Sequence, residues 1–248
     1  MESKRRATFD RALADFYQKI EDLTMEAVDG RRYILVEKLK TWMRAANPTN
    51  TLEGNYVTNT NLLAHAAFYG KVNFLPTEPS TIADPGRRCC VITFSILLDL
   101  ELGHLVHVFV RTGVHDDKLP MALSELKQKL GSVTLGDEVA ERFNKRQWAF
   151  CPAFFSMDMD EQFFEHRVVP VCRTQHINSG GTAHVRQIVI QAEFVDQKLR
   201  NLLDNDEFAS YEDKDFGPVS ELERAGTDVI RSTTVLTALP NTVLPFCA

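Results

Sequence analysis

The chain has 248 residues, is 44% hydrophobic and 25% charged, and carries a net charge of −6, which fits one large soluble domain or two small ones. Acids and bases are mixed along most of its length, so we expect no nucleic-acid partner; the basic cluster Lys4, Arg5 and Arg6 is interpreted as a solvated terminus. The longest apolar stretch, Cys89 to Leu98, is about half of what a membrane-spanning helix needs, so we expect no membrane segment.

The cysteines form an odd and widely scattered set, which favours reduced thiols over a disulfide framework. They are Cys89, Cys90, Cys151, Cys172 and Cys247. We therefore expect a cytoplasmic protein.

Two helices are predicted at the beginning of the chain. Apolar residues recur at steps of four and three from Phe9 to Ala27, which indicates an amphipathic helix over about residues 7–28. Gly30 ends it, and a second helix is predicted over 32–45. The pair is interpreted as a helical hairpin. The alternative is a coiled-coil seam with another chain, which would make these helices a self-association surface.

The next segments are also predicted to be helical. Asn59 or Thr60 caps a helix that ends at Gly70, and a proline-containing loop follows over residues 77–86. Residues 90–102 are apolar nearly all round, which favours a buried helix and leaves a buried strand as the alternative.

Two further helices have clear start and stop signals. Pro120 is predicted at the first position of a helix with leucines on one face, and Gly131 lies just past its end. Asp137 is predicted to cap the following helix, which reaches about Gln147.

The pattern changes in the second half of the chain. Residues 167–177 and 184–191 are rich in valine and isoleucine and flank a polar turn, which predicts a β-hairpin. Leucines at 199–203 indicate a brief helix, and the acid-rich segment 204–215 is predicted to be a solvated loop. The sequence therefore predicts an α+β fold.

The predicted organisation has two regions. Residues 1–147 form a mainly helical region, and residues 148–248 carry a small antiparallel β-hairpin or sheet. The tail from Asp228 onward is apolar and turn-rich with little periodicity.

The turn between the predicted strands carries the most informative motif, Ile177-Asn-Ser-Gly-Gly-Thr-Ala-His-Val185. It resembles the glycine-rich phosphate loop of protein kinases, G-x-G-x-x-G-x-V, in which backbone N–H groups approach phosphate oxygens. Gly180 matches the second glycine, whereas Asn178 and Ala183 replace the first and third. A plain hairpin turn is the alternative. The candidate nucleotide-binding residues are Asn178, Ser179, Gly180, Gly181, Thr182, Ala183 and Val185.

Segments upstream of this loop extend the resemblance. Ile92-Thr-Phe-Ser-Ile-Leu-Leu98, Gly113-Val-His-Asp-Asp-Lys-Leu-Pro120, Gln147-Trp-Ala-Phe-Cys-Pro-Ala-Phe154 and Val168-Val169-Pro170 are similar to the region before the kinase domain in fungal predicted serine/threonine protein kinases. The similarity covers residues 89–200. It implies that residues 148–248 resemble an incomplete kinase N-lobe.

The catalytic residues of a kinase have no convincing counterpart in this sequence. Phe208-Ala-Ser-Tyr211 is the best match to the Ala-x-Lys pattern, with tyrosine at the lysine position, and Glu221 is the nearest stand-in for the helix acid. Asp215-Phe-Gly217 spells the magnesium-binding motif but lies too close to the loop, and no His-Arg-Asp tripeptide occurs. Val185 is followed by 63 residues, too few to finish a kinase.

The resemblance therefore implies a noncatalytic, truncated, pseudokinase-like protein. We assign no catalytic residue and no cofactor, because the degenerate loop weakens contact with ATP. The expected role is binding of a protein partner that the sequence does not identify.

Other functions are alternatives to this one. His104 and His107 have a spacing that lets imidazoles share a metal ion, which would suit a metal-dependent enzyme of unrelated fold, but we assign no metal ligand because a third one is missing. His115-Asp116-Asp117 is interpreted as a polar turn, and Cys89-Cys90 as structural. An accessory product of a fungal biosynthetic gene cluster and a decayed kinase gene without activity are further alternatives.

Overall fold

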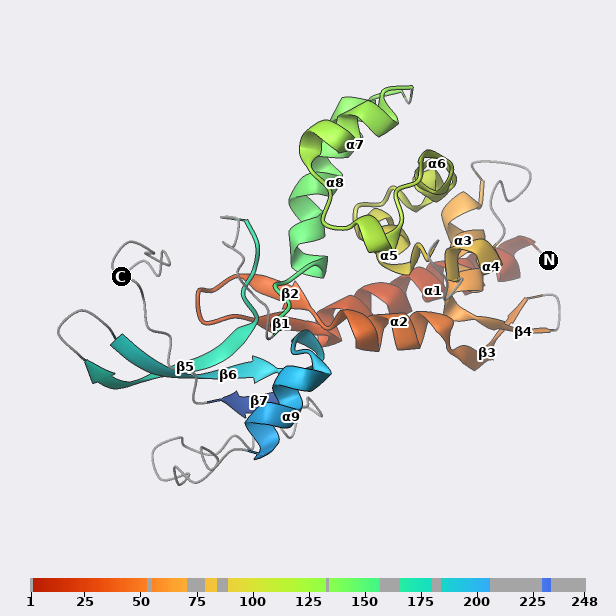
Figure 1. Cartoon of the computed structure of the whole chain (residues 1–248). Helices are drawn as coiled ribbons and strands as arrows, with labels where there is room; N and C mark the ends of the chain where they lie inside the picture. Colours follow the sequence, from red (N-terminus) through yellow and green to blue (C-terminus); the bar gives the residue numbers. More distant parts are fainter. Residues whose placement is uncertain are drawn as a thin grey trace. The chain divides into compact units, whose positions relative to one another are not determined.

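The structure is a computed structural model. It describes residues 2–52, 55–70, 79–83, 89–132, 134–156, 166–179, 184–205 and 229–232. The chain divides into two compact units, one formed by Met1–Thr24 and Ile34–Cys151 and the other by Met25–Tyr33 and Pro152–Ala248. The fold class is α+β, as the sequence predicts, with a mainly helical N-terminal region followed by a small antiparallel sheet (Figure 1).

The first unit is mainly helical. Its helices in the described residues are α1 (Glu2–Asp22), α2 (Val36–Arg44), α3 (Asn59–Phe68), α4 (Pro79–Ala83), α5 (Val91–Asp99), α6 (Val106–Thr112), α7 (Leu123–Leu130) and α8 (Gly136–Phe150). A short hairpin of β3 (Ala46–Leu52) and β4 (Asn55–Thr58) lies between α2 and α3 in the sequence. No helix in the described part of the chain is both long and apolar enough to cross a bilayer.

Helix α1 places the predicted apolar stripe in the core. Phe9, Ala12, Phe16 and Ile20 are all buried. Phe9 packs edge-on against the ring of Tyr69, with ring centroids 5.1 Å apart. The stripe therefore packs against residues of its own chain.

The predicted helix over 7–28 is wrong in its last part, because α1 ends at Asp22. The chain continues into β1 (Thr24–Glu26), which pairs with β2 (Arg32–Ile34). Gly30 forms the turn with a positive φ of 79°. The predicted second helix is shortened for the same reason, since β2 occupies its first residues and α2 begins at Val36.

Helix α5 is the most deeply buried helix element of the first unit. Every residue from Val91 to Leu98 is buried, which confirms the predicted buried helix, although it ends at Asp99 instead of Leu102. Side chains from two other helices donate hydrogen bonds to backbone carbonyls at its C-terminal end. The Tyr17 hydroxyl donates to the Leu98 carbonyl oxygen at 3.2 Å, and an Arg142 N–H donates to that of Leu100 at 2.9 Å.

The structure differs from the prediction at the start of one helix and within one loop. Thr58, not Asn59 or Thr60, caps α3, because its side-chain oxygen accepts a hydrogen bond from the Asn61 N–H at 3.2 Å. The predicted loop 77–86 contains the short helix α4, which begins at a proline.

The later helices were predicted with small errors in their start positions. Helix α7 begins at Leu123, three residues after Pro120, so this proline is not its first residue. Helix α8 begins at Gly136, and the residue in the capping position is Leu135 instead of Asp137. Lys127 of α7 and Glu141 of α8 form an ion pair at 2.6 Å between these adjacent helices.

Leu135 holds a backbone conformation that leucine rarely adopts. Its φ is 61°, in the left-handed region, and its side chain is 68% exposed. A Cβ in this region costs roughly 1–2 kcal/mol, whereas asparagine tolerates it better. We therefore expect Leu135→Asn to raise the free energy of unfolding by about 1 kcal/mol. Leu135→Ala should bring no such gain. Urea unfolding measures both variants, and an equal gain in stability from alanine would contradict this explanation.

The second unit is built on a three-stranded antiparallel sheet in the order β5–β6–β7. The sheet consists of β5 (Val171–Ser179), β6 (His184–Gln191) and β7 (Val229–Ser232), and α9 (Gln197–Asn205) follows β6 in the sequence. Buried Val171, Ile188, Ile190 and Val195 form its apolar cluster. The predicted β-hairpin is thus confirmed, and so is the brief helix after it. Residues 206–215 of the predicted acidic loop lie outside the described residues.

Candidate functional site

The predicted nucleotide-binding residues lie at the turn between β5 and β6. Asn178 and Ser179 end β5, and Val185 is the second residue of β6; Asn178 pairs with Val185 and Ser179 with His184. Gly180, Gly181, Thr182 and Ala183 lie outside the described residues. Antiparallel pairing therefore brings the two ends of the predicted loop together.

A third strand follows this hairpin at a place that sequence reasoning missed. Strand β7 places Arg231 in register with Val189 of β6. The segment chosen from the sequence for the lysine position, Phe208–Tyr211, lies outside the described residues, as do Asp215–Gly217 and Glu221. The basic residue on the third strand of the described sheet is therefore Arg231. A short strand of only four residues carries too little periodicity to be recognised in the sequence.

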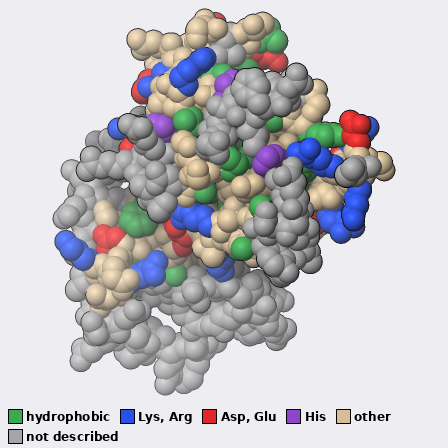
Figure 2. Space-filling view, turned by 90° about the vertical axis from the view of Figure 1, so that its right-hand side faces the viewer, with side chains coloured by type: hydrophobic (Ala, Val, Ile, Leu, Met, Phe, Trp, Pro, Cys, Tyr) green, Lys and Arg blue, Asp and Glu red, His purple; other side chains and the backbone are tan. Residues whose placement is uncertain are grey.

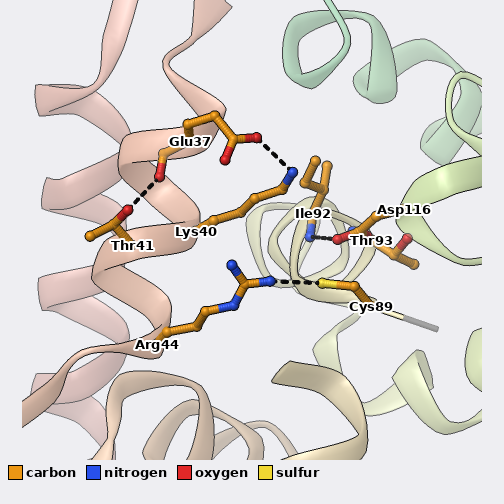
Figure 3. Close-up of polar contacts among 8 residues, drawn as sticks. All are labelled: Glu37, Lys40, Thr41, Arg44, Cys89, Ile92, Thr93 and Asp116. Atoms are coloured by element: carbon orange, nitrogen blue, oxygen red, sulfur yellow. Dashed lines mark hydrogen bonds and ion pairs between the residues drawn. The ribbon is translucent and has the colours of Figure 1, made fainter. Parts of the chain in front are cut away.

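A polar cluster lies in the first unit, at the beginning of α5 (Figure 3). The two carboxylate oxygens of Asp116 accept hydrogen bonds from the Ile92 N–H at 3.0 Å and the Thr93 N–H at 2.9 Å. The Asp116 N–H in turn donates to the Cys89 carbonyl oxygen at 2.8 Å. Asp116 thus caps a helix that lies 24 residues earlier in the sequence.

Helix α2 supplies a cation to this cluster. Lys40 is paired with Glu37 on the same helix at 2.8 Å. Arg44, one helical turn further on, donates an N–H to the Cys89 sulfur at 3.2 Å. The cluster therefore joins α2, α5 and the segment after α6.

The electrostatics of the cluster do not favour nucleophilic chemistry. Burial raises the pKa of the Cys89 thiol, and the nearby Asp116 charge raises it further. Burial also raises the pKa of Cys90, whose sulfur lies 3.1 Å from His115 Nδ1. Both thiols are therefore protonated at neutral pH. The arrangement fits a structural cap better than an active site.

The structure gives the ring of His107 partners within the first unit. The Nδ1 atom of His107 donates to the His104 carbonyl oxygen at 2.8 Å, and its ring packs against Phe68 with centroids 5.8 Å apart. Among the described residues, no group of three His, Cys, Asp or Glu side chains could hold a metal ion. The geometry thus gives the metal-enzyme alternative no support.

The charges on the surface are dispersed on the face that Figure 2 shows. Lys and Arg side chains occur there at several separate places among the described residues. Phosphate backbones bind to continuous positive patches. On the described part of this face, Lys and Arg side chains lie among acidic, histidine and apolar ones.

Comparisons of the chain with protein-family models, with curated proteins and with solved structures returned no match.

Proposed function

We propose that the chain is a noncatalytic, protein-kinase-like protein that acts by binding another protein. The supporting observation is the β5–β6 hairpin, in which β5 ends and β6 begins at the predicted loop residues. Strand β7 pairs with β6. A kinase phosphate loop likewise lies between two antiparallel strands, and the phosphate-binding lysine follows on the third.

The residue types argue against catalysis in such a fold. Two of the three loop glycines are replaced, by Asn178 and Ala183, and the sequence has no His-Arg-Asp tripeptide to supply the base for an acceptor hydroxyl. Removing one preorganised electrostatic contact commonly costs about 3–4 kcal/mol of transition-state stabilisation. A nucleotide held weakly at this turn would therefore not be turned over.

This proposal predicts that the purified chain shows no magnesium-dependent ATP hydrolysis and no phosphorylation of peptide substrates. An active kinase under the same conditions is the positive control. The variant Gly180→Asp, which places a carboxylate in the loop, identifies contaminating activity. Turnover by the wild-type chain that this variant abolishes would refute the proposal.

The same proposal includes a cytoplasmic location. The four cysteines in the described residues take part in no disulfide bond; they are Cys89, Cys90, Cys151 and Cys172. Reduced thiols are the usual state in the cytosol.

A further inference from the structure

Another polar cluster lies in the second unit, between the β1–β2 hairpin and the sheet. The Val28 N–H donates to the Val171 carbonyl oxygen at 2.9 Å, which holds the tip of the hairpin on β5. Tyr33 is 0% exposed, and its hydroxyl lies 3.3 Å from the sulfur of Cys172. The Tyr33 ring packs edge-on against Phe194, with centroids 5.6 Å apart. The tyrosine hydroxyl is therefore fixed beside this thiol.

Gln191 adds a buried donor to the same place. Its side chain is at the end of β6, the residue is 1% exposed, and its Nε2 atom has no hydrogen-bond partner among the described residues. Burial raises the pKa of both Tyr33 and Cys172, and the Gln191 side chain lies close enough to oppose part of that shift. Buried amide donors are nearly always paired. An oxygen atom added to the sulfur of Cys172 would supply the acceptor that this donor lacks.

Cys172 differs in its surroundings from the two thiols of the first unit. It is half-buried, and burial holds the pKa of its thiol above the usual value, while hydrogen bonds from the Tyr33 hydroxyl, the Gln191 side chain and the Gln191 backbone N–H partly oppose that shift. At Cys89 burial also raises the pKa, and the neighbouring carboxylate of Asp116 raises it further, although an Arg44 N–H donates to the sulfur. Donors thus converge on Cys172, and they would stabilise negative charge or an added oxygen on its sulfur.

We propose that Cys172 is a site of reversible oxidation, at which a hydroperoxide converts the thiol to a sulfenic acid. The sulfur attacks the outer peroxide oxygen, so an S–O bond forms and the O–O bond breaks. Sulfur loses two electrons, and hydrogen peroxide is reduced to water, which takes up the thiol proton. The new oxygen accepts hydrogen bonds from Gln191 Nε2 and the Tyr33 hydroxyl. This site is separate from the proposed nucleotide turn.

The test uses the full chain, hydrogen peroxide, and dimedone as a trap for sulfenic acids, with peptide mass spectrometry to compare the cysteines. We expect Cys172 to be labelled about 10-fold more than Cys89, because the Asp116 carboxylate disfavours negative charge at Cys89, whereas donors from Tyr33 and Gln191 face Cys172. Gln191→Met keeps the length of the side chain and removes the donor, and it should lower labelling of Cys172 about 10-fold. Iodoacetamide, whose product carries no oxygen on sulfur, should label this variant to within about threefold of wild type.

Thr174→Val is the matched control, because it removes a polar group two residues along the same strand and should leave labelling unchanged. Equal labelling of Cys172 and Cys89 in the wild-type chain would overturn the proposal. So would a folded Gln191→Met protein that is labelled at Cys172 like wild type. If circular dichroism shows that Gln191→Met does not fold, Tyr33→Phe decides: reduced labelling supports the proposal, and unchanged labelling refutes it.

Discussion

Replacing Gly136 by alanine should lower the free energy of unfolding by about 3 kcal/mol. A Cβ atom at this position would lie 2.2 Å from the carbonyl oxygen of Leu130 and 3.0 Å from its carbonyl carbon. Both are backbone atoms at the end of α7, so neither can rotate away as a flexible side chain could. The turn between α7 and α8 would have to open, and the packing of α8 would change with it.

Gly131→Ala is the matched control in the same turn, and we expect the opposite sign. Gly131 has an ordinary right-handed conformation, with φ −59° and ψ −17°, and a Cβ there would lie 3.4 Å from the nearest atom, the Lys127 carbonyl oxygen. Alanine fits this position and restricts the unfolded chain, which should stabilise the protein by about 0.5 kcal/mol. Urea unfolding followed by circular dichroism measures both changes. Equal losses from the two variants would contradict the close approach at Gly136.

The helices were predictable wherever the apolar period was long and unbroken. The stripe of α1 and the all-apolar sequence of α5 gave the correct element type, because burial on one face or on all faces leaves a direct trace in the sequence. The β1–β2 hairpin was missed because Leu23 and Ala27 continue the helical spacing and are buried in the structure as well. Periodicity alone could not distinguish a further helical turn from a hairpin that buries the same residues.

The parts of the candidate sites that depend on distant contacts could not be predicted. The β5–β6 turn was recognised because strand, turn and strand are adjacent in the sequence. The sequence around Asp116 indicates only a polar turn, since nothing local shows that its carboxylate reaches α5. Tyr33 and Cys172 are 139 residues apart in the sequence, so their contact depends on the fold.

Removing the Asp116 carboxylate should also have a large effect. Asp116→Ala leaves the buried N–H groups of Ile92 and Thr93 without their acceptor, and we expect it to lower the free energy of unfolding by about 2–3 kcal/mol. Asp117→Ala is the control, because the Asp117 side chain is 44% exposed and pairs with Lys118 at 3.8 Å, which is worth less than about 0.5 kcal/mol. Chemical denaturation should separate the two variants clearly, and equal midpoints would show that the cap contributes little.

The charge state of Asp116 gives this cap a defined pH dependence. Burial raises the pKa of its carboxyl group, and the hydrogen bonds from Ile92 and Thr93 only partly oppose that shift. The folded state therefore binds a proton here more tightly than the unfolded state, so the stability contributed by Asp116 is greatest at low pH. It should fall as the pH rises from about 4, near the usual aspartate pKa, through the raised pKa of the folded state.

The variant Asp116→Asn isolates this effect because it keeps one acceptor oxygen and does not titrate. As the pH rises through that range, the wild type should lose stability relative to Asp116→Asn. Above the range, the difference in the free energy of unfolding between the two proteins should become constant. Urea unfolding at a series of pH values measures the difference. A shift in favour of the wild type with rising pH would mean that the two amide hydrogen bonds outweigh burial, and that the carboxylate is held in its charged form as a permanent helix cap.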